Sequence, residues 1–204
     1  ATQGVSPPAA PTGLSATATS STQIDLTWTD NSGDETGFRI ERSPAGAATW
    51  SEVTTTLADV TAYSDIGLSA STAYDYRVFA VNAGGDSSPS TTATDTTFPA
   101  APSDLAGSGV STTQIDLTWT DNSSDETAFH VERSPNGTDS WTEIATPAAN
   151  ATGYSDTGLT ASTTYYYRVR ANRSGDFSAY SGVASVATQG VSPPAAPTGL
   201  SATA

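Results

Sequence analysis

The sequence predicts an all-β protein built as two tandem seven-stranded sandwiches that are joined by Pro-rich linkers. The first observation is that apolar and polar residues alternate with a period of two over short runs bounded by turn residues. No run keeps the 3.6-residue period of a helix. The second observation is that long strings recur at a constant spacing of 91 residues. Seven strands in roughly 90 residues is typical of a two-sheet sandwich.

The internal repeats define the expected domains. Three strings return 91 residues later with few or no substitutions: QIDLTWTDNS at 23–32, ETGFRIERSP at 35–44 and YSDIGLSAST at 63–72. Residues 1–18 are also identical to residues 187–204. We therefore expect four segments. These are the end of a preceding repeat and its linker at 1–6, repeat one at 7–98, repeat two at 99–190, and a linker with the first strand of a third repeat at 191–204.

Each predicted strand of repeat one has a buried face and a solvated face. In the first clear strand, Ile24, Leu26 and Trp28 alternate with polar residues. In the next strand Phe38 and Ile40 alternate with charged residues, and the sequence SPAG then supplies a turn. This alternation predicts that one face of each strand contributes to a core while the other meets water.

The pattern continues through the second half of repeat one. A long strand is expected to direct four side chains inward, namely Tyr74, Tyr76, Val78 and Ala80. The same strand is expected to direct Asp75, Arg77 and Phe79 outward. Residues 84–86 predict a turn, and the Thr-rich run 91–97 predicts the last strand. In repeat two we expect one residue to be missing in the stretch 168–172 relative to 77–82, and Phe177 to be an extra residue beyond it. The loop 172–176 is therefore the part of repeat two that repeat one predicts least well.

Several of these strings together resemble fibronectin type III domains of the kind found in secreted bacterial proteins. The resemblance rests on the Trp of IDLTW, on WTDNSGDETGFRIERS and WTDNSSDETAFHVERS, and on YSDxGL, and it covers both repeats. It implies an immunoglobulin-like sandwich in which Tyr74 and Tyr165 match the tyrosine corner, where the phenol closes onto upstream backbone. It implies a scaffold and names no ligand, because this fold serves many functions.

Composition excludes most catalytic and binding chemistries. The chain of 204 residues carries a net charge of −14, and its seven basic residues are all Arg. This charge opposes binding to nucleic acids or to anionic membrane surfaces, and no apolar run is long enough for membrane insertion. Without Cys and with one His, the chain offers no disulfide, zinc site or Cys nucleophile. We therefore expect no enzyme activity, no catalytic residue and no cofactor.

An acidic cluster occurs once in each repeat. It consists of Asp30, Asp34 and Glu35 in repeat one and of Asp121, Asp125 and Glu126 in repeat two. Asp30, Ser32 and Asp34 fall at the first, third and fifth positions of a calcium loop. However, the sixth position is Glu35 rather than Gly, and a strand follows rather than a helix. The cluster is therefore interpreted either as a cation loop or, with more support, as a turn capped by Asx hydrogen bonds.

Aromatic residues and the single histidine offer two further candidates. Trp50 and Trp141 follow the Pro-containing turns and predict either platforms for stacking a sugar ring or a hydrophobic closure of the sandwich edge. Phe79, Tyr166 and Tyr180 would extend such a platform. His130 aligns with Arg39 on the outward side of its strand, so we expect it to make a surface contact with the neighbouring strand.

Three functions fit these observations. The first is a structural repeat unit of an extracellular or cell-surface fibre, stalk or filament, whose partners are other copies of the repeat joined head to tail. The second is a spacer or weak glycan-binding accessory module of a secreted polysaccharide-degrading enzyme. The third is a set of calcium-rigidified adhesin repeats. Polysaccharide is the one further partner class that the sequence suggests.

The linkers yield two more expectations. The short FPAAP junction at 98–102 should be stiffer than the longer QGVSPPAAP, with Phe98 covering the contact between domains. The first strand of a third repeat, expected at 196–201 and including Leu200, cannot recover its ordering entropy alone. We therefore expect another copy of the repeat to hold that strand, either within a continuous array or filament or by strand addition on a neighbouring molecule.

Overall fold

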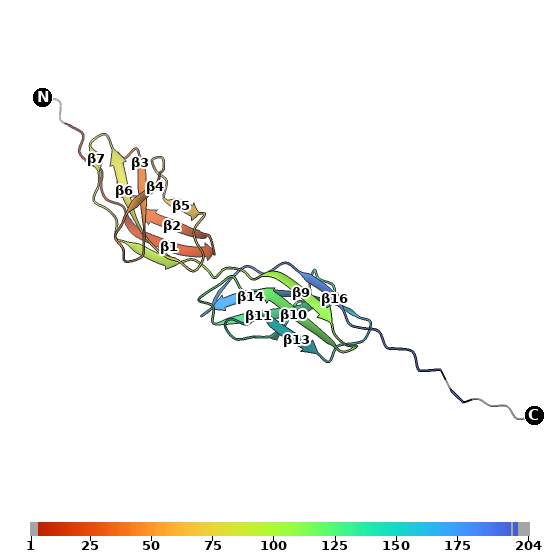
Figure 1. The fold of residues 1–204 in the computed structure, drawn as a ribbon. Coiled ribbons are helices and arrows are strands. Elements are labelled where there is room, and N and C mark those ends of the chain that lie inside the picture. The colour runs from red at the N-terminus through yellow and green to blue at the C-terminus, as the bar shows by residue number, and fades with distance from the viewer. Residues whose placement is uncertain (1–3, 197, 200–204) are drawn as a thin grey trace, which may run out of the picture.

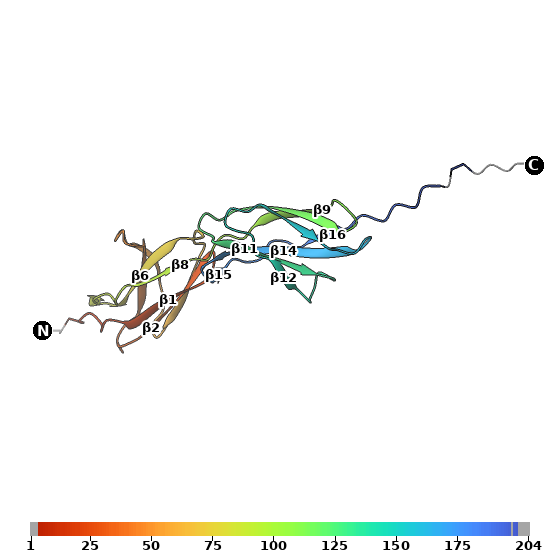
Figure 2. The same ribbon diagram turned by 90° about the horizontal axis from the view of Figure 1, so that it is seen from below.

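The computed structural model describes residues 4–196, 198 and 199, and these residues form two β-sandwiches placed end to end (Figure 1). The described segments that precede β1 and follow β16 leave an elongated molecule at opposite ends, as the perpendicular view also shows (Figure 2). The prediction of two tandem all-β sandwiches is confirmed. The part of the chain that the structure describes contains no helix able to cross a membrane.

The first sandwich consists of a three-stranded and a five-stranded sheet. The strands of the first sheet lie in the order β1-β2-β5, and those of the second in the order β4-β3-β6-β7 with β8 on the other side of β6. All of these pairs are antiparallel. The strands are β1 Thr12–Ser20, β2 Gln23–Thr29, β3 Gly37–Pro44, β4 Ser51–Thr55, β5 Ala62–Ile66, β6 Ala73–Asn82, β7 Gly85–Asp86 and β8 Ala93–Thr96.

The second sandwich repeats this topology. Its sheets have the orders β13-β10-β9 and β12-β11-β14-β15, with β16 paired to β14. The strands are β9 Ser103–Gly109, β10 Gln114–Thr120, β11 Ala128–Ser134, β12 Thr142–Ala145, β13 Gly153–Thr157, β14 Thr164–Arg173, β15 Asp176–Phe177 and β16 Ala184–Ala187. In both sandwiches a two-residue strand, β7 or β15, accompanies the seven predicted strands. Residues 84–86, predicted as a turn, therefore contribute β7.

The predicted inward rows form the cores. Trp28 on β2 and Phe38 on β3 meet across the two sheets with ring centroids 5.6 Å apart, and Trp119 and Phe129 repeat this contact at 5.6 Å. The remaining core side chains of the first sandwich include Ile24, Leu26, Ile40, Tyr76, Val78 and Ala80. The strict period of two is thus explained by two sheets that each bury one face.

A buried polar contact also joins the two sheets. Tyr76 on β6 donates a 2.9 Å hydrogen bond to Asp65 on β5, which is 3% exposed, and Arg42 on β3 donates another at 2.7 Å. Tyr167 and Arg133 bind Asp156 in the same way in the second sandwich. Burial and the adjacent carboxylate raise the pKa of Tyr76 far above its ordinary value, so the phenol remains a donor.

The tyrosine corner is present in both sandwiches. The Tyr74 hydroxyl accepts a 3.1 Å hydrogen bond from the backbone N–H of Ser69, and the Tyr165 hydroxyl accepts one of 3.1 Å from Thr160. The connection between β5 and β6 is therefore fixed by a side chain that the sequence places six residues after the Leu of YSDxGL.

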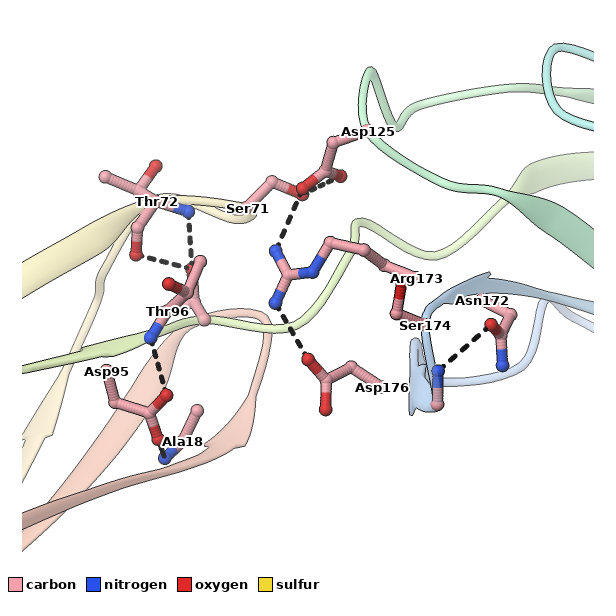
Figure 3. A network of polar contacts seen from close by, with 12 residues as sticks. Ala18, Ser71, Thr72, Asp95, Thr96, Asp125, Asn172, Arg173, Ser174 and Asp176 are labelled. Atoms are coloured by element: carbon pink, nitrogen blue, oxygen red, sulfur yellow. Dashed lines mark hydrogen bonds and ion pairs between the residues drawn. The ribbon is translucent and has the colours of Figure 1, made fainter.

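The two sandwiches close differently between their first and last strands. In the first, the Ala18 N–H on β1 donates a 2.7 Å hydrogen bond to the Asp95 carboxylate on β8 (Figure 3). In the second, Val186 takes the position of Asp95, and Gly107 provides room for it. A Cβ on Gly107 would lie 2.5 Å from Cγ2 of Val186. A polar tie is thus replaced by an apolar contact.

Two expectations require correction. Phe79 faces outward but is buried, because the guanidinium groups of Arg39 and Arg77 lie 4.2 and 5.1 Å from its ring centroid. The stretch 168–172 has lost no residue, because Asn172 pairs with Ala128 in the same register as Val81 with Gly37. The two hairpins differ by substitution alone, and Phe177 is the counterpart of Asp86.

The end of the chain does not test the expected third repeat. Residues 188–196, 198 and 199 form no regular strand, and 191–196 are exposed. The remainder of the expected strand at 196–201, including Leu200, falls outside the described residues.

Candidate functional site

The junction between the sandwiches is held by a polar contact. Ser71, in the β5–β6 connection of the first sandwich, donates a 2.5 Å hydrogen bond to Asp125 of the second (Figure 3). Asp125 lies in the loop between β10 and β11, where the Ser123 hydroxyl also donates to it at 3.1 Å. The sequence identified Asp125 as part of an acidic cluster, but the structure places its carboxylate at the contact between domains.

Arg173 completes this contact, which we call the junction clamp (Ser71, Asp125, Arg173 and Asp176). Arg173 stands at the end of β14 and donates to Asp125 at 2.9 Å and to Asp176 at 3.0 Å. Burial acts to raise the pKa of Asp125, but the hydrogen bonds from Ser71, Arg173 and Ser123 outweigh it and the pKa lies below its ordinary value. The carboxylate is therefore ionised at neutral pH and holds both partners.

The same hairpin of the first sandwich binds a linker instead. Asn82, the counterpart of Arg173, donates a 3.0 Å hydrogen bond to the carbonyl of Ser6. The linker passes so closely over Gly84 that a Cβ there would lie 2.2 Å from the Val5 carbonyl oxygen. At the corresponding Gly175 nothing lies within 4 Å. The long linker thus occupies this end of the first sandwich. At the corresponding end of the second sandwich, the short junction places the preceding sandwich instead.

Phe98 has a different place from the one expected. Its side chain packs against the core of the first sandwich. Its backbone N–H donates to Ser20 and its carbonyl accepts from Ser71, both at 3.1 Å. Phe98 thus anchors the start of the junction to the first sandwich. The contact that crosses the junction is instead the hydrogen bond between Ser71 and Asp125.

A second candidate site is a group of three carboxylates in the first sandwich. Asp30 and Glu35 come from the loop between β2 and β3, and Asp59 comes from the loop between β4 and β5. One carboxylate oxygen from each lies within 4.8 Å of the others. The sequence found Asp30 and Glu35 but missed Asp59, which is remote along the chain. Asp34 turns away and accepts hydrogen bonds from Ser32 and Asn82.

The second sandwich has a reduced version of this group. Asp121 and Glu126 correspond to Asp30 and Glu35, but Asn150 replaces Asp59 and its N–H donates to Glu126 at 2.8 Å. Burial raises the pKa of Asp121 above its ordinary value, and the nearby charge of Glu126 adds to this effect. The Asx turn expected here exists too, since the Asp121 and Asp30 carboxylates accept from Ser123 and Ser32 at 3.0 and 2.9 Å.

The candidate sugar platforms are covered by arginine. The guanidinium of Arg77 lies 4.4 Å from the Trp50 ring centroid, and that of Arg168 lies 4.3 Å from Trp141 and 3.7 Å from Tyr180. Each tryptophan therefore has one ring face occupied by a cation–π contact. Tyr166 lies on the same outward face of β14 as Arg168, against the turn at 137. Over the described surface no pocket opens.

His130 makes the kind of surface contact expected of it. It pairs with Arg170 across the β11–β14 ladder, and its Nδ1 lies 2.6 Å from a Glu143 carboxylate oxygen. Its ring meets Phe177 edge to face at 5.0 Å between centroids. These contacts occupy His130 as a structural side chain of the outer sheet face.

Comparison with known proteins gives consistent matches. The family model for the fibronectin type III domain matches residues 9–96 and 100–187. Exoglucanase B of Cellulomonas fimi is 35% identical over 96% of this chain and 18% of its own length. Chitinase A1 of Niallia circulans is 33% identical over 89% of this chain and 26% of its own length. The chain thus spans about a fifth to a quarter of these relatives.

A solved structure shows the same fold. A two-domain fibronectin type III segment from chicken tenascin superimposes with a TM-score of 0.51, covering 87% of this chain and 99% of that segment at 18% identity. Fibronectin type III domains are non-catalytic modules, and the family model covers both sandwiches.

Proposed function

Because this chain belongs to the fibronectin type III family, we propose that it is a non-catalytic spacer module of a secreted polysaccharide-degrading enzyme. The relatives support this proposal, since a glucanase and a chitinase each contain a region similar to this chain within a much longer protein. The extracellular location is part of the same proposal.

The observation that carries the proposal is the junction clamp. A spacer must hold what flanks it at a defined separation, and a flexible linker would not do so. Here a short Pro-containing segment and the Ser71–Asp125 hydrogen bond join two sandwiches whose outer ends point in opposite directions. The pair is therefore suited to act as one stiff rod.

Spin labels provide the test. The chain has no Cys, so Ser51→Cys and Thr157→Cys, at exposed positions on β4 and β13, introduce one label in each sandwich. Double electron–electron resonance should give a single narrow distance distribution. A broad distribution like that of a flexible tether would contradict the rod.

Spacing is favoured over glycan binding because arginines cover Trp50 and Trp141. After sedimentation of cellulose or chitin particles, the chain should remain in the supernatant, as should serum albumin, which serves as the non-binding control. Retention on the particles, lost in Trp50→Ala or Trp141→Ala, would replace the spacer by a glycan-binding module.

A fibre or stalk of many repeats is the second candidate. It is favoured by the identity of residues 1–18 with residues 187–204, which suggests recent duplication of a two-domain unit. The complete reading frame distinguishes the two functions, because a catalytic domain beside the repeats supports the spacer and a long uninterrupted array supports the fibre. Association of copies head to tail and adhesion to a target stay predictions.

A further inference from the structure

The acidic group of the first sandwich contains a buried carboxylate oxygen that has no partner. Glu35 is 8% exposed, and its Oε2 is buried without a hydrogen bond. Its Oε1 accepts a 3.3 Å hydrogen bond from the Asp59 N–H. Buried polar atoms are almost always paired, so an orphaned oxygen beside two further carboxylates requires an explanation.

The charge of this group is not neutralised by the protein. Among the described residues, each arginine that forms an ion pair does so with a carboxylate other than those of Asp30, Glu35 and Asp59. Carboxylate oxygens that lie within 4.8 Å of each other repel unless a cation joins them.

We propose that Asp30, Glu35 and Asp59 bind one calcium ion. All three ligands are hard carboxylate oxygens, and no His or Cys belongs to the group, which favours calcium over transition metals. Calcium–oxygen distances of about 2.3–2.6 Å allow two ligand oxygens up to about 5 Å apart on one ion, which the observed 4.8 Å satisfies. Water completes the coordination on the exposed side.

The ion would link two loops that belong to different parts of the sandwich. The loop with Asp30 and Glu35 passes from one sheet to the other, between β2 and β3, while Asp59 precedes β5. The same loop contacts the incoming linker, because the Asn31 side chain donates a 2.9 Å hydrogen bond to the Ala10 carbonyl. Calcium would thus stiffen the end of the sandwich that meets the preceding segment.

The second sandwich provides a matched control within the same chain. Asp121 and Glu126 are retained there, and the Glu126 Oε2 is also buried without a partner, but Asn150 replaces Asp59. Both Asp59 and Asn150 adopt the same backbone conformation, with φ of 61°. The exchange of one carboxylate for a neutral amide is therefore the principal difference, and we expect the second site to bind calcium at least tenfold more weakly.

Isothermal titration of the whole chain with calcium chloride in 150 mM sodium chloride tests the proposal. We expect one site, with a dissociation constant in the range of about 10⁻⁴–10⁻³ M that extracellular calcium modules show. Asp59→Asn should lose this site and Asn150→Asp should add a second. Asp34→Asn removes a carboxylate from the same loop but outside the group, so it should leave binding unchanged.

Thermal unfolding gives a readout that does not depend on binding heat. Calcium should raise the unfolding temperature of the parent chain, magnesium should do so less, and EDTA should reverse the effect. Asp59→Asn should abolish the increase while circular dichroism confirms a folded chain. The proposal is overturned if the parent shows no heat and no increase up to 10 mM calcium, or if Asp59→Asn behaves like the parent. Because the spacer proposal rests on the junction clamp, neither result bears on it.

Discussion

Ser71 and Asp125 belong to different sandwiches, and the hydroxyl of the first donates a 2.5 Å hydrogen bond to the carboxylate of the second. Arg173 holds the other oxygen of the same carboxylate at 2.9 Å. One ionised group thus fixes both the hairpin of its own domain and the neighbouring domain. The counterparts of Asp125 and Arg173 in the first sandwich are Asp34 and Asn82, and there Asn82 binds both Asp34 and the incoming linker.

Removing the hydroxyl tests this arrangement. Ser71→Ala should broaden the distance distribution between labels on the two sandwiches, while the free energy of unfolding of each changes by less than about 1.5 kcal/mol, the usual net value of one hydrogen bond. Ser162→Ala, at the corresponding position of the second sandwich, should leave the distribution unchanged. Equal widths in both variants would show that the linker alone orients the domains.

The clamp should depend on pH in a defined window. The pKa of folded Asp125 lies below its ordinary value of 3.8, so ionised Asp125 stabilises the junction fully above that value. This stabilisation is lost as the pH falls through the folded-state pKa. Distance distributions recorded between pH 7 and pH 2 should broaden only below about pH 3.8. Asp125→Asn should show no such transition. Broadening that begins near pH 6 would show that a group other than Asp125 controls the junction.

The tryptophan at each core should decide the stability of its own domain. Trp28→Ala or Trp119→Ala removes a nearly fully buried ring that contacts a phenylalanine of the opposite sheet, and should cost about 3–5 kcal/mol. Chemical denaturation should then show one sandwich unfolding first. Trp50→Ala, which removes a partly exposed ring, is the control and should cost clearly less. A Trp28→Ala variant within about 1 kcal/mol of the parent would contradict the core assignment.

The buried hydroxyl of Tyr76 should contribute to the stability of the first sandwich. Tyr76→Phe leaves the Asp65 carboxylate with Arg42 but without its second donor, so the first sandwich should lose about 1–3 kcal/mol. Tyr63→Phe keeps the ring of a half-buried side chain and should change stability by less than about 0.5 kcal/mol. Denaturant titrations give the free energy of unfolding of each variant. Equal losses in the two variants would show that the hydrogen bond from Tyr76 to Asp65 does not stabilise the sandwich.

The sequence was sufficient to predict the sandwiches because their cores depend on a local rule. Ile24, Leu26 and Trp28 are spaced by two, and a strand with that spacing must bury one face. Phe79 shows where the rule fails. Its outward position was predicted correctly, but its burial depends on the long side chains of Arg39 and Arg77, whose conformation alternation does not describe.

The candidate sites depend on contacts between distant residues, which a local pattern cannot predict. Asp59 joins Asp30 and Glu35 only because the β4–β5 loop folds beside the β2–β3 loop. The spacing of a calcium loop instead selected Asp34, whose carboxylate binds Ser32 and Asn82. Likewise, Asp125 was identified as acidic, but its partner Ser71 belongs to the other repeat. An alignment of the two repeats without a gap would have paired Arg173 with Asn82 and indicated that the junctions differ.

The different closure of the two sandwiches has a mechanical consequence. Because the chain ends lie at opposite ends of the molecule, tension enters each sandwich through its first strand and leaves through its last. In the first sandwich, sliding of β1 against β8 must break the charge-assisted bond between Ala18 and Asp95. In the second, sliding of β9 against β16 shears Val186 past Gly107 and breaks a neutral hydrogen bond, from the Gln189 side chain to the Gly109 carbonyl. A stretched chain should therefore yield in two unequal steps, the second sandwich first, and the force trace of a single pulled molecule should show two peaks of different height.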